Sequence, residues 1–163
     1  MKKFVLASFA LALSISAFAA DATGKWNGKF KMDLSGVKKM VQSQAKMTAE
    51  QKAQQMKQLD GAEKVMSSAT IKMELKKDHT VSVAQTTNGK TKNDTAKWTQ
   101  TGSKVRVFDF KLKDGGPTEM TGVISANGKT IVFDLSNEMK KQAQAKGAPA
   151  GFNGKMMITF TKA

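Results

Sequence analysis

The sequence has no cysteine, one histidine and one arginine among its 163 residues. The lack of cysteine excludes disulfides, thiolate metal sites and cysteine redox chemistry, so stability must come from core packing and sheet closure. His79 stands alone in an expected turn, and the acidic residues are scattered singly. No Ser-His-Asp order, phosphate loop or zinc-ligand spacing occurs. We therefore expect no enzymatic activity, no catalytic residue, no metal site and no cofactor.

Residues 1–19 have the pattern of a secretory signal. Two lysines precede an apolar run from Phe4 to Ile15, which is too short to span a bilayer, and Ala17-Phe18-Ala19 fits signal-peptidase cleavage. The alternative is an uncleaved anchor, but no stop-transfer pattern follows. No cysteine follows the run either, which excludes a lipid-anchored lipoprotein. We expect cleavage between Ala19 and Ala20, a periplasmic or secreted protein, and one domain over residues 20–163.

Positively charged residues far outnumber negatively charged ones in the chain. Removal of the two signal lysines would leave 25 basic and 13 acidic residues, a net charge of +12. The lysines recur from Lys25 to Lys162 and alternate with apolar residues, which indicates a solvated surface on all sides rather than a focused patch. This scatter, with no basic and aromatic cluster, argues against nucleic-acid binding. Contact with an anionic membrane surface is compatible with the charge.

Alternation of apolar and polar residues predicts eight short strands. In the first, Trp26, Gly28, Phe30 and Met32 share one face and alternate with lysines and an asparagine. The others show the same period of two. The expected strands cover residues 25–33, 69–76, 81–85, 96–100, 104–110, 120–124, 131–135 and 156–160.

Residues 34–67, between the first two strands, have helical periodicity. Ser35 is the expected N-cap of a first helix, and Thr48 with Gln51 has the spacing of a capping box that begins a second. Gly61 predicts a kink or break in the second helix. Its expected apolar stripe consists of Ala49, Ala53, Met56, Leu59, Ala62, Val65 and Met66.

The connections alternate in length, which predicts their placement. We expect long connections after the first, third, fifth and seventh strands, the second of them containing Asn88-Gly89, the third Asp114-Gly115-Gly116-Pro117 and the last a short helix after Ser136 or Asn137. Tight turns join the other strands, and Asn127-Gly128 is a type I′ signal. In a meander, successive connections lie at opposite ends of the sheet. The sequence therefore predicts a mainly β fold: an eight-stranded up-and-down antiparallel barrel, closed by its first and last strands, with residues 34–67 as a helical lid at the open end.

Gly24-Lys25-Trp26 on the first strand, with Lys162 at the end of the last, resembles the lipocalin-like (calycin) signature. This resemblance implies that Gly24, Trp26 and Lys162 are structural residues of barrel closure, with the tryptophan plugging the closed end and the basic side chain lying across it. The two helices within residues 34–67 resemble the lid of fatty-acid-binding proteins. A small bacterial lipocalin-like barrel is the family that these features indicate.

The open and covered end favours non-covalent binding of a small hydrophobic or anionic amphipathic ligand by a monomer. Inward-facing apolar side chains would bury the apolar part, and surface lysines would steer an anionic head group. The candidate ligand-binding residues are Phe30, Met32, Met56, Leu59, Met73, Val83, Gln85, Arg106, Phe133 and Ile158.

The role of Arg106 depends on which face it occupies. If Phe108 and Phe110 point inward, Arg106 does too and can hold a ligand carboxylate through two parallel hydrogen bonds. If Val105 and Val107 point inward, it is a surface charge, which the β-branched inward residues of earlier strands favour.

Two other functions remain open at this point. Inward side chains can fill an eight-stranded barrel completely, which would leave a packed envelope structural or protein-interaction module. The ten methionines that follow the signal also suit copper(I). Their spacing argues against copper, since Met40 and Met47 would lie about 10 Å apart along one helix.

Overall fold

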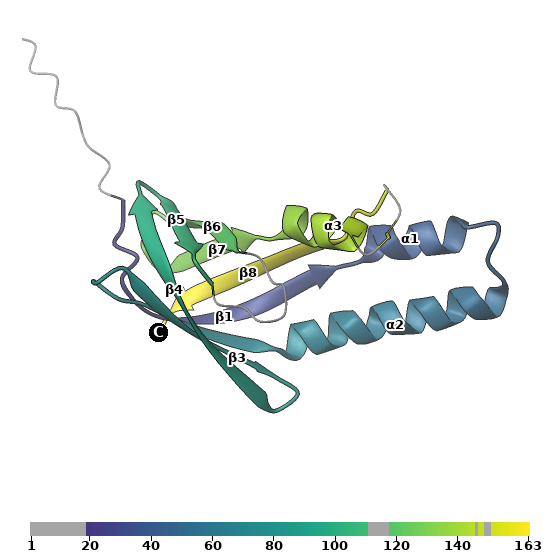
Figure 1. Cartoon of the computed structure of the whole chain (residues 1–163), viewed down its shortest axis with the longest axis horizontal. Coiled ribbons are helices and arrows are strands. Elements are labelled where there is room, and N and C mark those ends of the chain that lie inside the picture. The colour runs from purple at the N-terminus through teal and green to yellow at the C-terminus, as the bar shows by residue number, and fades with distance from the viewer. Residues whose placement is uncertain (1–18, 111–117, 146, 149–150) are drawn as a thin grey trace, which may run out of the picture.

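Eight antiparallel strands form a closed barrel in sequence order in the computed structural model, which describes residues 19–110, 118–145, 147–148 and 151–163 (Figure 1). The last strand pairs with the first along eight residue pairs, from Trp26 with Lys162 to Asp33 with Lys155. This confirms the predicted up-and-down closure. The strands are β1 (Gly24–Asp33), β2 (Thr70–Leu75), β3 (Thr80–Thr87), β4 (Lys90–Thr101), β5 (Lys104–Phe108), β6 (Glu119–Ile124), β7 (Thr130–Asp134) and β8 (Lys155–Lys162).

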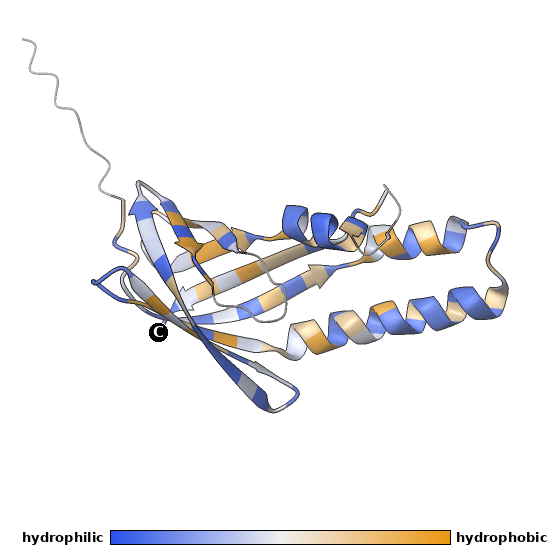
Figure 2. Ribbon diagram, in the orientation of Figure 1, coloured by the Kyte–Doolittle hydropathy of each residue, from blue (hydrophilic) through white to orange (hydrophobic). Residues whose placement is uncertain are grey.

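Two helices, α1 (Ser35–Ser43) and α2 (Ala49–Ser68), lie between β1 and β2, as predicted, and α3 (Ser136–Ala145) lies between β7 and β8. The α1–α2 hairpin, expected as a lid, projects away from the open end of the barrel (Figure 1). Most of α2 is hydrophilic, whereas α1 carries a hydrophobic face (Figure 2). Within the described residues, no helix combines the length and apolar character that crossing a membrane requires.

The first two helices confirm one capping prediction, correct another, and correct the expected break at Gly61. Thr48 and Gln51 form the predicted capping box of α2. Ser35 is not a cap but the first residue of α1, and its backbone N–H donates to the Asp33 carboxylate at 2.9 Å. Gly61 does not break α2, because the helix is exposed there and no other group lies within 4 Å of a Cβ built on Gly61. An exposed helix tolerates a glycine at a cost of about 1 kcal/mol.

The predicted long connection between the third and fourth strands is wrong. β3 and β4 are joined by the tight turn Asn88-Gly89, whose φ angles of 51° and 74° fit a type I′ hairpin. The polar residues expected in a loop belong to a hairpin that extends beyond its neighbours (Figure 1), and residues 84–93 of this hairpin are half-buried or exposed. β5 ends before the predicted Phe110, since Asp109 adopts a φ of 65°. The expected loop 114–117 and residues 1–18 of the signal lie outside the described residues.

Two phenylalanine rings fill the half of the barrel that lies nearest its closed end. Phe133 and Phe160 are fully buried, and their rings meet edge to face at 5.7 Å. Each lies over a glycine on the neighbouring strand: a Cβ on Gly28 would be 2.6 Å from Cε1 of Phe160, and one on Gly122 would be 2.9 Å from the Phe133 ring. The glycines leave the space that the rings occupy, so this half is a packed core.

This packing predicts opposite effects for two glycine substitutions. Gly28→Ala should destabilise the protein by about 1–3 kcal/mol, because its methyl group would overlap Ile71 and Phe160. Gly61→Ala, in open space on α2, should stabilise by about 0.5–1 kcal/mol. Urea unfolding measures both. A Gly28→Ala variant as stable as the unsubstituted protein would show that the Phe160 ring does not pack on Gly28.

The closed end of the barrel is sealed around Trp26. The indole Nε1 donates to the Ala22 carbonyl oxygen at 2.9 Å, and Nζ of Lys162 lies 5.4 Å from the ring centroid. Gly24 has a φ of 124°, and Lys162 passes beside it. The Gln100 amide holds the preceding segment by accepting from Ala22 N at 3.0 Å and donating to Ala20 O at 2.7 Å. The barrel is consistent with a calycin-like fold.

Removing the Trp26 ring tests this seal. Trp26→Ala should cost about 3–5 kcal/mol of unfolding free energy, as for other buried aromatic residues. The exposed neighbour Lys25 offers a matched control, and Lys25→Ala should change stability by about 0.5 kcal/mol or less. Urea unfolding followed by circular dichroism compares the two. A cost below about 1 kcal/mol for Trp26→Ala would contradict the burial of this ring.

Candidate functional site

Half-buried apolar side chains gather at the open end of the barrel. Met66 at the end of α2, Phe110 after β5, Met120 on β6 and Met156 on β8 each pack against the core without being fully buried. Met32, also half-buried, stands directly opposite Met156 in the pairing of β1 with β8. We call these five residues the mouth cluster. They offer adaptable apolar surface at the end opposite Trp26.

The predicted ligand-binding residues fall into three groups. Four belong to the packed interior and are at most 9% exposed: Phe30, Met73, Phe133 and Ile158. Met32, Val83 and Gln85 are half-buried on the inner face. Met56 and Leu59 are half-buried on α2, where Met56 lies about 15 Å along the helix axis from Met66 at 1.5 Å per residue. The barrel thus brings the first two groups together, and the last two residues lie out on the hairpin.

Arg106 lies on the outer face of the barrel. Val105 and Val107 are fully buried, and the Arg106 side chain between them is 52% exposed. Its Nε and Nη2 donate to the two carboxylate oxygens of Glu119 on β6, at 2.5 and 2.6 Å. The Arg106 guanidinium is therefore already paired with a carboxylate of the protein, that of Glu119 on the neighbouring strand. The inward-facing alternative for Arg106 is wrong, and the surface alternative is confirmed.

Asp94 is an inward-facing polar residue that the sequence analysis does not predict, because its polar surroundings indicate a loop. It stands opposite Val83 in the β3–β4 pairing and in phase with buried Ala96. Oδ1 of Asp94 accepts from Thr95 N at 2.7 Å, whereas its buried Oδ2 has no hydrogen-bond partner in the described part of the chain. An unpaired buried acceptor costs about 1–3 kcal/mol, so this oxygen favours any donor that reaches it. The inward direction of Asp94 has one signal in the sequence, because Asp94 alternates in phase with the apolar residues Ala96 and Trp98.

Glu63 on α2 bonds to the start of α1 through both of its carboxylate oxygens. One carboxylate oxygen accepts from Leu34 N at 2.7 Å, and the other accepts from Nζ of Lys38, which also pairs with Asp60 at 2.7 Å. These bonds lower the pKa of Glu63, the Lys38 hydrogen bond most strongly. Met56, Leu59 and Met66 of the predicted stripe are half-buried, whereas its alanines and Val65 are exposed. The half-buried residues of α2 are Lys52, Met56, Leu59, Glu63 and Met66.

The lowered pKa of Glu63 predicts acid-sensitive docking of α1 on α2. Its stabilising effect is complete above the ordinary value of 4.5 and is lost as the pH falls through the lower folded value. Hydrogen-exchange protection of the Leu34 amide, corrected for intrinsic rates, should therefore fall in acid. Glu63→Gln should lower protection at neutral pH and remove the acid dependence, and Glu50→Gln, an exposed control, should do neither. An unchanged acid profile in Glu63→Gln would contradict this role.

Among the residues that the structure describes, no three or more histidine or acidic side chains come together in a way that could hold a metal ion. The chemistry of the open end is apolar contact with a few hydrogen-bonding groups. Comparison of the chain with known protein families, curated proteins and solved structures finds no match.

Proposed function

We propose that this protein is an exported, lipocalin-like monomer that binds a small hydrophobic or amphipathic molecule at the mouth of its barrel. The observation that carries the proposal is the mouth cluster, in which methionine and phenylalanine side chains stay half-buried above a filled core. Burial of a ligand methylene there is worth about 0.8 kcal/mol. Methionine adapts to irregular apolar ligands, since its side chain is unbranched and flexible.

In this proposal, the interior residues have different roles in binding. The buried Phe30, Phe133 and Ile158 would lie beneath the ligand, and Met32 and Met156, which are paired across β1 and β8, would contact it from one side. The surface lysines attract anionic amphipathic molecules and anionic membrane surfaces, and an anionic head group would stay at the rim among them. The protein acts in the periplasm after cleavage between Ala19 and Ala20, with no catalytic step and no cofactor.

Two adjacent methionines supply the test. Met156 faces the mouth, and Met157 lies on the opposite face of β8. Protein recovered from the periplasm, with an intact mass that starts at Ala20, is delipidated and titrated with oleate and with an apolar fluorescent probe. We expect micromolar binding, weakened about tenfold by Met156→Gln and unchanged by Met157→Gln, because only the first places an amide against the ligand.

The packed structural or protein-interaction module is the second candidate, favoured by the phenylalanine rings that fill the lower barrel. If side chains also fill the mouth of the barrel, no lipid or hydrophobic probe will bind the delipidated protein. Equal effects of Met156→Gln and Met157→Gln would also contradict mouth binding. Urea unfolding of each variant separates a loss of binding from a loss of fold.

A further inference from the structure

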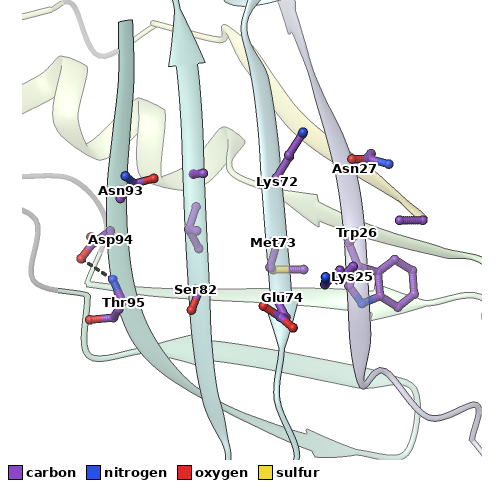
Figure 3. A pocket seen from close by; sticks show the side chains of 13 residues that line it. Lys25, Trp26, Asn27, Lys72, Met73, Glu74, Ser82, Asn93, Asp94 and Thr95 are labelled. Carbon is purple, nitrogen blue, oxygen red and sulfur yellow. Dashed lines mark hydrogen bonds between the residues drawn. The ribbon is translucent and has the colours of Figure 1, made fainter.

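A polar groove of about 710 Å³ crosses the outer face of β1 to β4 and shares no residue with the mouth cluster (Figure 3). The strand register forms its walls from two rows of side chains. One wall consists of Lys25, Glu74, Ser82 and Thr95, and the other of Asn27, Lys72, Ala84 and Asn93. The row between them, which includes Trp26 and Met73, turns its side chains to the barrel interior, so backbone forms the floor.

The polar side chains of the two walls have no partners among the residues that the structure describes. None of the seven makes a side-chain hydrogen bond or ion pair with any residue of the described structure. Lys25 and Glu74 oppose each other directly and still form no ion pair. Elsewhere on the surface such neighbours do pair, as Thr86 with Thr91 at 2.8 Å. The groove therefore presents a set of free donors and acceptors.

The two ends of the groove differ in chemistry. At the β1–β2 end, Lys25 and Lys72 stand on opposite walls at diagonal positions, about 7–8 Å apart at their Cα atoms. Two ammonium groups across a groove suit one anionic group, to which each donates hydrogen bonds. At the β3–β4 end, Ser82, Thr95 and Asn93 offer hydroxyl and amide groups, which match sugar hydroxyls as donors and acceptors.

The remaining residues limit the ligand class. Glu74, beside the lysines, disfavours a dense polyanion such as a nucleic acid, while it can accept from a hydroxyl group. Ala84 is the only apolar side chain in the two walls, so a hydrocarbon chain gains little here. Three strand spacings of about 4.8 Å make the groove about 14 Å long, enough for a short linear molecule.

We propose that this groove binds a short acidic oligosaccharide. Its carboxylate lies between Lys25 and Lys72, and its hydroxyls contact Ser82, Thr95 and Asn93. This site is independent of the proposed ligand of the mouth.

The probe is the linear trimer of galacturonic acid, with neutral maltotriose as the matched uncharged sugar. Both are titrated into isotopically labelled protein, and backbone amide shifts are followed by NMR. We expect saturable shifts on the outer strands β1 to β4 and none in the mouth cluster. Lys72→Gln should weaken trigalacturonate about tenfold, since one charge-assisted hydrogen bond is lost, and leave maltotriose unchanged. Asn93→Ala should weaken both sugars.

Lys29→Gln is the control, because Lys29 is exposed on the same face of β1 and lies outside the groove. It should leave trigalacturonate binding unchanged. A loss equal to that of Lys72→Gln would show general attraction to a basic surface and overturn the proposal. So would shifts confined to the mouth, equal binding of a short single-stranded DNA, or no saturable binding of either sugar. All three substituted side chains are exposed, and unchanged spectra away from the groove would establish that the variants fold.

Discussion

The narrow interior of an eight-stranded barrel is the constraint on which the rest of this structure depends. Eight strands enclose a space that side chains can just fill. Here the rings of Phe160 and Phe133 fill the interior near the closed end, and Gly28 and Gly122 leave the space that these rings occupy. The buried Trp26 ring seals the closed end of the barrel, and the Lys162 ammonium lies over this ring. A ligand inside the barrel would therefore have to lie at the open end, where Met120, Met156 and their neighbours are half-buried.

The same alternation of side chains gives the first four strands two separate chemistries. Inward residues such as Met73 build the core, while the residues on either side of it, Lys72 and Glu74, line the outer groove. A substitution at an outer position can change the groove without changing the core. The proposed mouth ligand and the proposed oligosaccharide can therefore be tested by independent sets of variants.

The sequence predicted the barrel well because period-two alternation reports burial directly. Trp26, Ile71 and Ile158 all occupy the inner face, as their patterns indicated. Prediction failed where burial did not control the pattern. The polar residues 86–94 of the β3–β4 hairpin have no apolar alternation, so their pattern indicates a loop and not the inward direction of Asp94.

The hairpin of α1 and α2 shows the same limit. Met56, Leu59 and Met66 of its predicted apolar stripe are half-buried, but the ion pair between Glu63 and Lys38 was not predicted. A charged pair at a half-buried position has no signature in hydrophobic periodicity. The orientation of Arg106 was open for a related reason: both β-branched and aromatic neighbours fit an inner face, and only the observed packing of Val105 and Val107 decides between them.

Closure by β1 and β8 also has a kinetic consequence. Trp26 pairs with Lys162, so the barrel joins residues from opposite ends of the chain. Loop-closure entropy opposes such distant contacts, and folds dominated by them form slowly. The seal cannot form until β8 has been synthesised. Until then, the helices and hairpins of a nascent chain can form, but its sheet keeps two unpaired edges, at β1 and at the last strand made.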